Sequence, residues 1–433
     1  MTTTVAEASA APEVSRRRGT VQVARRLGWG VADQGISSLS NFALGLYVAH
    51  SFSASTFGAF ALAFVTYTVV INASRGLTTD PLLVRHSGDL HRRWRRATAA
   101  ATGTALVVGV AAGSVCVGAG LLLSDPVGPV FVALGVGLPG LALQDSLRFA
   151  FFARGRGSSA FVNDLIWTVL LVLALVALDS RGDSSAALCL LVFGLTATLA
   201  AVLGAVQASV LPRPIGAAGW LRAHHQLSVR YLAENVSISG ASQLRSFVLG
   251  AVAGLAAVGY VRASEILMGP FFVVLMGLSQ VAVPEASRVF HRNPRHLGRF
   301  CFTLGGAQAT AAVAWGLILM TVFPLGPGPA LLGELWVPTA QLLPAITLTL
   351  AAASFVTTAT AGLRAMGLAH RSLRAQLIAS TAYAIGGISG AVLGGAVGTS
   401  WGVTIALWFS AVVWWHQLRS ALADHQLESE MAK

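Results

Sequence analysis

Acidic, amide and hydroxyl side chains recur at helical spacing in two otherwise apolar stretches of this sequence, VADQGISSLSN (31–41) and LAENVSISGASQ (232–243). The first stretch carries a polar stripe at i, i+4, i+7 and i+8: Asp33, Ser37, Ser40 and Asn41. A similar stripe begins in the second stretch, at i, i+3, i+8 and i+11: Glu234, Ser237, Ser242 and Arg245. Such spacings place side chains on one helix face, where they can hydrogen-bond a polar ligand or hold a cation. Helix packing through the serines is the alternative, but it does not explain the two acids.

Three arginines interrupt apolar stretches and could bind an anion: Arg148, Arg245 and Arg262. A guanidinium stays charged and engages two phosphate oxygens at once, so we expect these side chains to face a phosphate or diphosphate. Two of them stand three residues from an acid, as Asp145 with Arg148 and as Arg262 with Glu265. Side chains at that spacing can pair on one helix face. Self-neutralising pairs that only stabilise the fold are therefore an equal alternative.

The other polar groups in apolar stretches divide by the chemistry open to them. We expect the amides to hydrogen-bond a polar substrate: Gln34, Asn41, Asn235 and Gln243. The acids are candidates for carrying a coupling proton or sodium ion: Asp33, Glu234, Asp145, Asp164 and Glu265. Asp164 could equally cap a helix. Charge in lipid costs from about 2.5 kcal/mol per residue upward, so the sequence predicts that these groups face a shared polar interior.

The composition places these groups in a membrane protein. Of the 433 residues, 55% are hydrophobic and 11% are charged, and the mean hydropathy is +0.70. Soluble domains carry about 25% charged residues, so the chain is expected to be a multi-pass membrane protein. A transmembrane helix needs roughly 20 apolar residues, and we predict twelve spans: 28–50, 56–77, 98–123, 128–152, 161–179, 185–210, 230–253, 257–283, 300–323, 339–362, 376–395 and 399–418.

The arginines orient the predicted spans. Twelve spans put both termini on one side, and the N-terminal tail and even-numbered loops carry nearly all the arginines, whereas the odd-numbered loops carry only Arg181. The positive-inside rule then makes the even loops and both termini cytoplasmic in an inner membrane. This placement also accounts for the formal charge of +12, which would face anionic phospholipids rather than nucleic acid.

Matching residues in the two halves indicate a tandem repeat. Asp33 matches Glu234 and Gly58 matches Gly259, both 201 positions on. Repeats of six spans share one orientation, and such transporters place their site between the repeats. We therefore predict an all-α membrane protein with two six-helix lobes around a central cavity. Its predicted parts are a disordered cytoplasmic tail (1–26), an N-terminal lobe (27–210), a cytoplasmic linker (211–229), a C-terminal lobe (230–420) and a cytoplasmic C-terminal tail (421–433).

Features typical of an enzyme are scarce in the sequence. The three cysteines lie in apolar runs without metal-ligand spacing, so no metal, cofactor or disulfide is expected. Because the only lysine is Lys433, a GxxxxGK[ST] phosphate-binding loop is excluded. The longest predicted outer loop, FPLGPGPALLGELWVP (323–338), offers one acid, Glu334, and no base. A polytopic glycosyltransferase or glycan polymerase is therefore the weaker alternative.

Three segments carry a resemblance to a known family: Asp33–Gln34, SASTFGAFALAF (53–64) and LRFAFFARGRG (147–157). With the motif S-x-x-x-F-G-x-F/Y, which begins at Ser53, the chain resembles the polysaccharide flippases of the multidrug/oligosaccharidyl-lipid/polysaccharide exporter (MOP) superfamily over about residues 20–420. The resemblance implies two six-helix lobes in a V around a cavity whose cationic residues meet the substrate. It also implies export of undecaprenyl-diphosphate-linked oligosaccharides by alternating access. Twelve spans disfavour the lipid II flippase branch, which usually adds two helices.

The expected protein is thus a flippase for a lipid-linked oligosaccharide in cell-surface polysaccharide synthesis, and not an enzyme. Its diphosphate would be held by Arg148, Arg245 and Arg262. Glycan polymerases are candidate partners, and a proton or sodium ion is the candidate coupling ion. The closest alternative is a proton- or sodium-coupled drug antiporter of the same superfamily, because Asp33 and Glu234 could carry the ion. The arginines favour an anionic substrate over a cationic drug.

Overall fold

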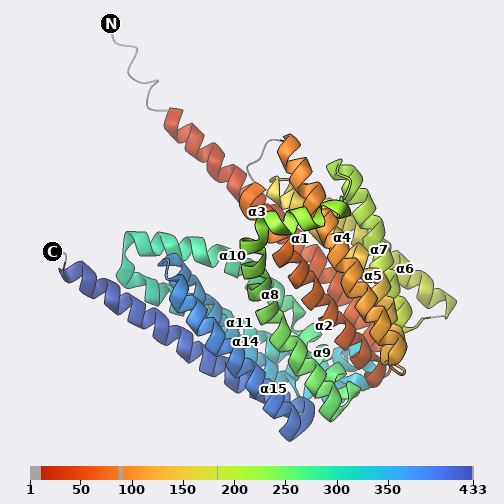
Figure 1. Ribbon diagram of the computed structural model, residues 1–433. Helices are drawn as coiled ribbons and strands as arrows, with labels where there is room; N and C mark the ends of the chain where they lie inside the picture. The colour runs from red at the N-terminus through yellow and green to blue at the C-terminus, as the bar shows by residue number, and fades with distance from the viewer. Residues whose placement is uncertain (1–10, 87–90, 183, 432–433) are drawn as a thin grey trace.

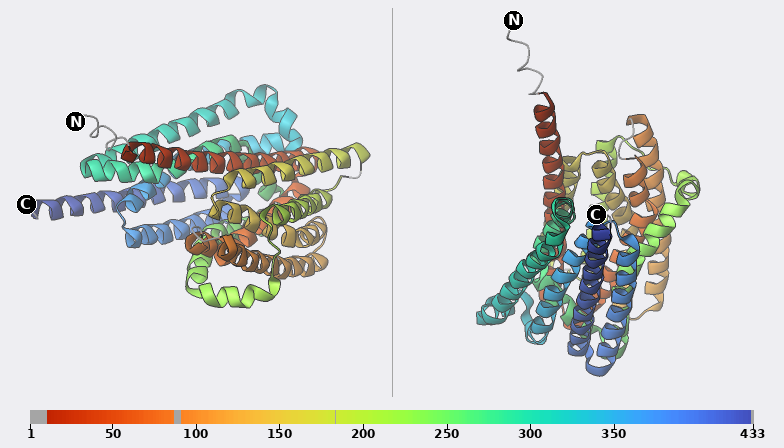
Figure 2. Two further views of the ribbon diagram at one scale, coloured as in Figure 1. Left: turned by 90° about the horizontal axis from the view of Figure 1, so that it is seen from above. Right: turned by 90° about the vertical axis from the view of Figure 1, so that its left-hand side faces the viewer.

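The computed structural model describes residues 11–86, 91–182 and 184–431, and these residues form helices and no strand. The first and last helical residues described, Ala11 and Met431, lie toward the same end of the molecule (Figures 1 and 2). Long apolar runs fold as helices in lipid because each helix pairs its backbone N–H and C=O groups internally. The predicted all-α membrane fold is therefore confirmed.

The first half of the chain forms the N-terminal lobe, followed by a short 3-10 turn, η1 (Pro214–Gly216). Its helices are α1 (Ala11–Ser51), α2 (Ala54–Leu77), α3 (Thr79–His86), α4 (His91–Leu122), α5 (Val127–Ala153), α6 (Gly157–Arg181) and α7 (Ala186–Ala208). Two serines set the starts of helices here: Ser53 accepts from the Thr56 amide before α2, and Ser185 accepts from the Leu188 amide before α7. Such caps satisfy amides that have no partner within the helix.

The second half forms the C-terminal lobe. Its helices are α8 (Ala217–Ala253), α9 (Leu255–Leu267), α10 (Gly269–Arg292), α11 (Leu297–Thr321), α12 (Pro327–Leu332), α13 (Trp336–Ala340), α14 (Leu343–Ala365) and α15 (Ala369–Met431). Three 3-10 turns join them: η2 (Pro294–His296), η3 (Phe323–Leu325) and η4 (Gly333–Leu335). Non-helical backbone at Gly394 and Gly395 divides α15 into two helices.

Eight helical segments among the described residues are long and apolar enough to cross a membrane, judged by length and composition alone. The last of them, His370–Leu427, contains two predicted spans because of the break at Gly394 and Gly395. The remaining predicted spans fall on α1, α8 and the α9–α10 pair, the helices that carry the polar stripes and the Arg262–Glu265 pair. All twelve predicted spans therefore fall on helices, in two lobes.

The two lobes share a hydrophobic core at one end and have separate cores at the other. Leu44, Phe60 and Val261 belong to the shared core, which joins α1, α2 and α9. Trp94 lies in a core of the N-terminal lobe, and Trp414 lies in a core of the C-terminal lobe. The lobes thus form a V that is joined at one end and diverges toward the chain ends (Figure 1).

A pair of glycines permits the close contact at the joined end. A Cβ on Gly58 of α2 would lie 1.8 Å from the carbonyl oxygen of Leu255, at the start of α9. A Cβ on Gly259 of α9 would lie 2.7 Å from the carbonyl oxygen of Ala54, at the start of α2. The two contacts are related by the same shift of 201 residues that the sequence repeat shows. The helices α2 and α9 therefore cross as equivalent members of two repeats.

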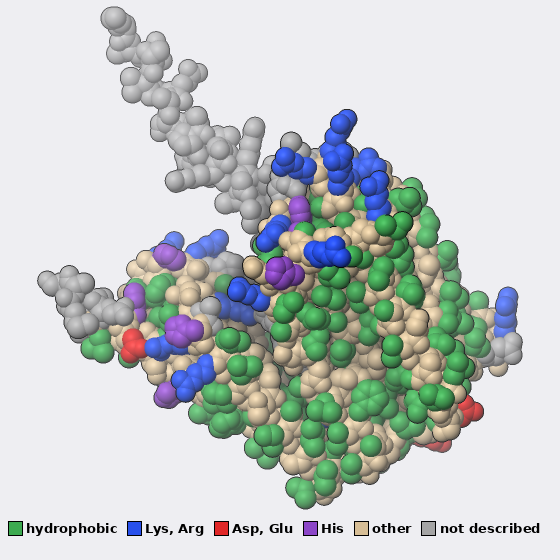
Figure 3. Space-filling model, in the orientation of Figure 1, with side chains coloured by type: hydrophobic (Ala, Val, Ile, Leu, Met, Phe, Trp, Pro, Cys, Tyr) green, Lys and Arg blue, Asp and Glu red, His purple; other side chains and the backbone are tan. Residues whose placement is uncertain are grey.

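Basic and apolar side chains separate along the molecule. Arginines and histidines gather mainly at the end where the chain ends lie, while apolar side chains cover much of the flank (Figure 3). Four exposed arginines open α4: Arg92, Arg93, Arg95 and Arg96. A multi-pass membrane protein has this distribution when its basic end faces the cytoplasm.

The structure differs from the expected domain boundaries at three places. The expected disordered tail, 1–26, is helical from Ala11, where α1 begins; residues 1–10 lie outside the described residues. The expected linker, 211–229, contains η1 and the start of α8. The expected C-terminal tail, 421–433, continues α15 as far as Met431.

Candidate functional site

A cavity of about 810 Å³ lies between the two lobes. Its wall is built by α1 and α2 from the N-terminal lobe and by α8, α9, α10, α14 and α15 from the C-terminal lobe. Most lining side chains are apolar, among them Phe42, Phe64 and Phe272. This volume is in the range of sites that bind small molecules, about 300–1,000 Å³. The cavity therefore suits a ligand, or part of one, that is largely apolar.

The charged part of the cavity wall consists of two arginines that share one glutamate. Glu265 of α9 accepts from Arg245 of α8 at 3.1 Å through Oε1 and from Arg262 of α9 at 3.2 Å through Oε2. All three residues line the cavity. The Nε atoms of both arginines are buried without a hydrogen-bond partner among the described residues. The site therefore holds one surplus positive charge.

Two aromatic rings contact these guanidiniums. The Arg262 guanidinium lies 4.9 Å from the ring centre of Phe64, and the Arg245 guanidinium lies 5.6 Å from that of Tyr383. Cation–π contacts hold an arginine without using its hydrogen-bond donors. The rings thus orient both arginines without occupying their hydrogen-bond donors.

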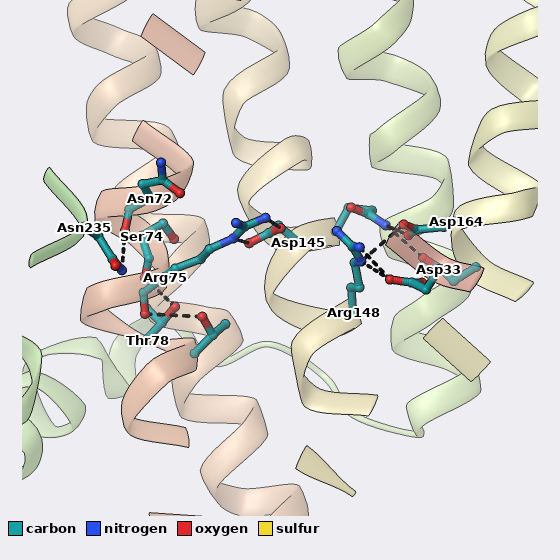
Figure 4. Close-up of polar contacts among 12 residues, drawn as sticks. Asp33, Asn72, Ser74, Arg75, Thr78, Asp145, Arg148, Asp164 and Asn235 are labelled. Carbon is teal, nitrogen blue, oxygen red and sulfur yellow. Dashed lines mark hydrogen bonds and ion pairs between the residues drawn. The ribbon is translucent and has the colours of Figure 1, made fainter. Parts of the chain in front are cut away.

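A second charged cluster is buried inside the N-terminal lobe. Arg148 of α5 lies within 2.5 Å of the Asp33 carboxylate from α1 and 3.2 Å from the Asp164 carboxylate from α6 (Figure 4). Gln144 donates to Asp164 at 2.7 Å. The side chains of Asp33, Asp164 and Arg148 are 0%, 1% and 9% exposed. Only other polar groups can compensate their charges at that depth.

Arg75 extends this network from α2. Its guanidinium makes two hydrogen bonds to Asp145, at 2.7 and 2.9 Å (Figure 4). The Arg75 and Arg148 guanidiniums also lie 4.9 and 5.8 Å from the ring centre of Phe149. Asp145 and Arg148 are therefore neutralised by partners on other helices, whereas Arg262 and Glu265 form the expected contact three residues apart.

The structure brings four of the candidate residues together at the cavity and separates the rest. Asn41, Arg245, Arg262 and Glu265 line it. The buried network contains Asp33, Asp145, Arg148 and Asp164, which lie outside the lining. Asp164 stands seven residues after the start of α6, so it does not cap that helix. The side chain of Glu234 lies outside the described residues.

The remaining amides bind other parts of the protein. Asn235 of α8 donates to Asp80 at 2.9 Å and to the backbone of Asn72 at 3.2 Å. Gln243 of α8 donates to Thr66 of α2 at 2.8 Å. Both amides therefore connect α8 of the C-terminal lobe to α2 and α3 of the N-terminal lobe. Gln34 donates to Ser38 at 3.3 Å, and Ser38 lines the cavity.

Sequence reasoning missed Arg75, Gln144 and Tyr383 as site residues. Arg75 falls within the predicted span 56–77; in the structure it lies in the last turn of α2 and its guanidinium reaches Asp145 in α5. Asp145 lies within a predicted span, and a buried acid needs a cationic partner. That requirement was the signal that could have pointed to Arg75. The sequence carried no comparable signal for Gln144 or Tyr383, because their partners come from distant helices.

Comparison with known proteins addresses the fold. No family model matches the sequence, and no curated protein matches it. An inward-facing multidrug resistance MATE family transporter of the MOP superfamily matches with a TM-score of 0.65 and 14% identity, covering 90% of this chain and 95% of that one. A MOP superfamily transporter from Pyrococcus furiosus gives a TM-score of 0.61 and 14% identity, covering 93% and 95%.

The lipid II flippase MurJ, in an inward closed conformation, matches with a TM-score of 0.69 and 11% identity, covering 90% of this chain and 87% of that one. The likeness extends over nearly the whole chain in each case, and these proteins transport rather than catalyse. The chain therefore has the multi-pass membrane fold shared by MOP superfamily transporters and the lipid II flippase.

Proposed function

We propose that this protein is a flippase that moves an amphipathic anion, of the class of undecaprenyl-diphosphate-linked oligosaccharides, across the inner membrane. The observation that carries the proposal is the placement of Arg245 and Arg262 around a single Glu265 on the wall of the inter-lobe cavity. A surplus guanidinium charge favours a phosphate group, because charge-assisted pairs with arginine are strong and directional.

The character of the remaining wall supports an amphipathic cargo. Apolar side chains such as Leu39, Phe42 and Phe272 line the cavity beside the charged group. Leu39 and Phe272 are 56% and 37% exposed, so apolar surface is available to a lipid tail. A diphosphate at the arginines and a prenyl chain along these residues would satisfy both parts of the wall.

The arrangement of the lobes supports alternating access. The two lobes share a core at one end and have separate cores at the other. Rocking of one repeat against the other can therefore open the joined end and close the divergent end without disrupting either separate core. The basic surface at the divergent end favours a cytoplasmic orientation for that end and for both termini.

The buried network of the N-terminal lobe supports ion coupling. Among the described residues, its three carboxylates face two guanidiniums, those of Arg75 and Arg148. The Oδ1 atom of Asp33 is buried and has no hydrogen-bond partner among the described residues. A proton or a sodium ion would compensate the surplus negative charge. Arg148, already bound to two carboxylates, is a weaker candidate for the substrate than Arg245 and Arg262.

The experiment is a flipping assay in proteoliposomes with a fluorescent undecaprenyl diphosphate saccharide. Replacing Arg245 or Arg262 with alanine should reduce the initial rate about tenfold or more, because a hydrogen bond to a charged group contributes about 1.5–3 kcal/mol. Arg364→Ala, which removes an exposed arginine at the end of α14, is the matched control and should flip at the wild-type rate. Wild-type rates in both cavity variants, at equal protein incorporation, would contradict the proposal.

A drug antiporter is the second candidate, favoured by the acidic surplus around Asp33 and by the fold shared with MATE transporters. The same vesicles distinguish it. Export of ethidium driven by a proton or sodium gradient, lost in Asp33→Asn and unchanged in Arg245→Ala, would establish the antiporter. Glycan polymerases and anionic phospholipids remain proposed partners of the flippase.

A further inference from the structure

Glu265 occupies the same guanidinium donors that an anionic substrate would use. Its two carboxylate oxygens lie 3.1 Å from Arg245 Nη2 and 3.2 Å from Arg262 Nη1. The arginines come from different helices, α8 and α9, so the carboxylate bridges two elements of the C-terminal lobe. A phosphate oxygen offers these donors the same kind of acceptor, with more negative charge to share.

The exposure of the three side chains permits exchange. Glu265 and Arg262 are 27% and 23% exposed, whereas Arg245 is 8% exposed. A displaced Glu265 carboxylate can therefore be hydrated in the cavity, while Arg245 is held in place by packing and by the Tyr383 ring. By contrast, Asp33 and Asp164 are nearly fully buried around Arg148, and a ligand has no comparable access to that pair.

The charged groups on the described cavity wall show which side chains act on Glu265. The groups that face Glu265 are Arg262 on its own helix and Arg245 from α8, with Tyr383 of α15 beyond Arg245. The described lining residues of α1, α2, α10 and α14 are uncharged. Displacing Glu265 therefore exposes the full charge of two guanidiniums to the substrate, and returning it neutralises one of them.

We propose, on the basis of the proposed function, that Glu265 is an internal competitor for the substrate anion. The phosphate group displaces the Glu265 carboxylate from Arg245 and Arg262 when the substrate binds. Rebinding of the carboxylate then displaces the phosphate and speeds release. Glu265 thus sets the affinity of the site low enough for turnover, as a positioning residue that acts through the two arginines.

Binding and transport separate this role from a structural one. The probe for binding is farnesyl diphosphate, titrated into purified full-length protein in detergent by calorimetry. Glu265→Gln keeps the size of the side chain and removes its charge, so it should bind the probe about tenfold more tightly, or about 1.4 kcal/mol. In the flipping assay the same variant should be several-fold slower, because release becomes limiting. Glu265→Asp, which keeps the charge, should restore most of the rate.

The controls make each outcome informative. Glu285→Gln removes a glutamate that pairs with Arg288 outside the cavity, and it should leave both measurements unchanged. Weaker probe binding by a folded Glu265→Gln variant would show that Glu265 only orders the arginines, and would overturn the competitor role. Affinity equal to wild type would overturn it as well. If the wild type fails to bind the probe and Arg245→Ala changes nothing, the proposed anionic substrate itself is wrong.

Discussion

Gly58 of α2 and Gly259 of α9 each allow the backbone of the other helix to approach where a side chain would not fit. The carbonyl oxygen of Leu255 lies 1.8 Å from the position of a Cβ on Gly58, and that of Ala54 lies 2.7 Å from a Cβ on Gly259. The contact joins the two lobes at their closed end, where the hydrophobic core is shared. In alternating access this crossing has to separate when the closed end opens.

Replacing Gly58 with alanine should therefore prevent the closed end from closing fully. Backbone atoms cannot give way as a flexible side chain can, so overpacking here should destabilise this arrangement by about 1–3 kcal/mol or more. The measurement is the spin–spin distance between labels at Ser55 and Ala256, which should lengthen. Gly306→Ala, where a Cβ meets nothing within 4 Å, is the control. An unchanged distance distribution in Gly58→Ala would contradict the expectation.

Loss of Arg148 should strongly destabilise the N-terminal lobe. Without its guanidinium, Asp33 and Asp164 become unpaired buried carboxylates, and such a change costs about 3–5 kcal/mol. The free energy of unfolding of Arg148→Gln in lipid nanodiscs measures the loss. The double variant Asp33→Asn, Arg148→Gln should recover part of it, because one unpaired charge is removed. If the two substitutions add without coupling, the ion pair contributes nothing to stability.

His224 should make stability depend on pH at the start of α8. It lies before the predicted span that begins at 230, and its ring centre lies 4.0 Å from that of Trp220 and 5.6 Å from that of His86. Burial lowers the pKa of His224, the charges of His86 and Arg85 lower it further, and the Trp220 carbonyl opposes the shift. Folding thus favours the neutral imidazole, and this stabilisation is present above about pH 6.5 and lost as the pH falls through the folded-state pKa.

The measurement is the unfolding midpoint from pH 8 to pH 5 for the wild type and for His224→Gln. The difference between them should be constant above pH 7 and should shrink below it, because only the wild type pays for protonating this imidazole. The exposed His370 supplies the control variant His370→Gln. Parallel curves for the wild type and His224→Gln would show that His224 does not titrate on unfolding.

The break in α15 should depend on one of its two glycines. Gly395 has a φ of 57° and a ψ of −133°, a conformation that L residues rarely adopt, whereas Gly394 has a φ of −154°. Gly395→Ala should therefore lower the free energy of unfolding by about 1–3 kcal/mol, and Gly394→Ala should lower it less. Thermal unfolding of both variants in the same detergent tests this, and equal losses would count against it.

The fold could be predicted from the sequence because its signals are local. Apolar runs of membrane length, the arginine distribution and the Gly58–Gly259 repeat each act within one segment or between equivalent segments. The partners in the site could not be predicted, because they depend on how helices rotate against one another. Arg148 is an example: its spacing favours Asp145, but α5 turns it toward α1 and α6, where Asp33 and Asp164 lie.

The two charged clusters carry formal net charges of opposite sign. The cluster around Arg148 in the N-terminal lobe is negative, and the cluster around Glu265 in the C-terminal lobe is positive. Among the described residues, these two groups therefore set up a local field between a negative region in the N-terminal lobe and a positive region in the C-terminal lobe. A cargo with a single charged end would enter this field in one preferred orientation, with its anionic end against the C-terminal lobe. The uncharged remainder of its head would then lie toward α1. The two lobes would therefore contact different parts of the cargo.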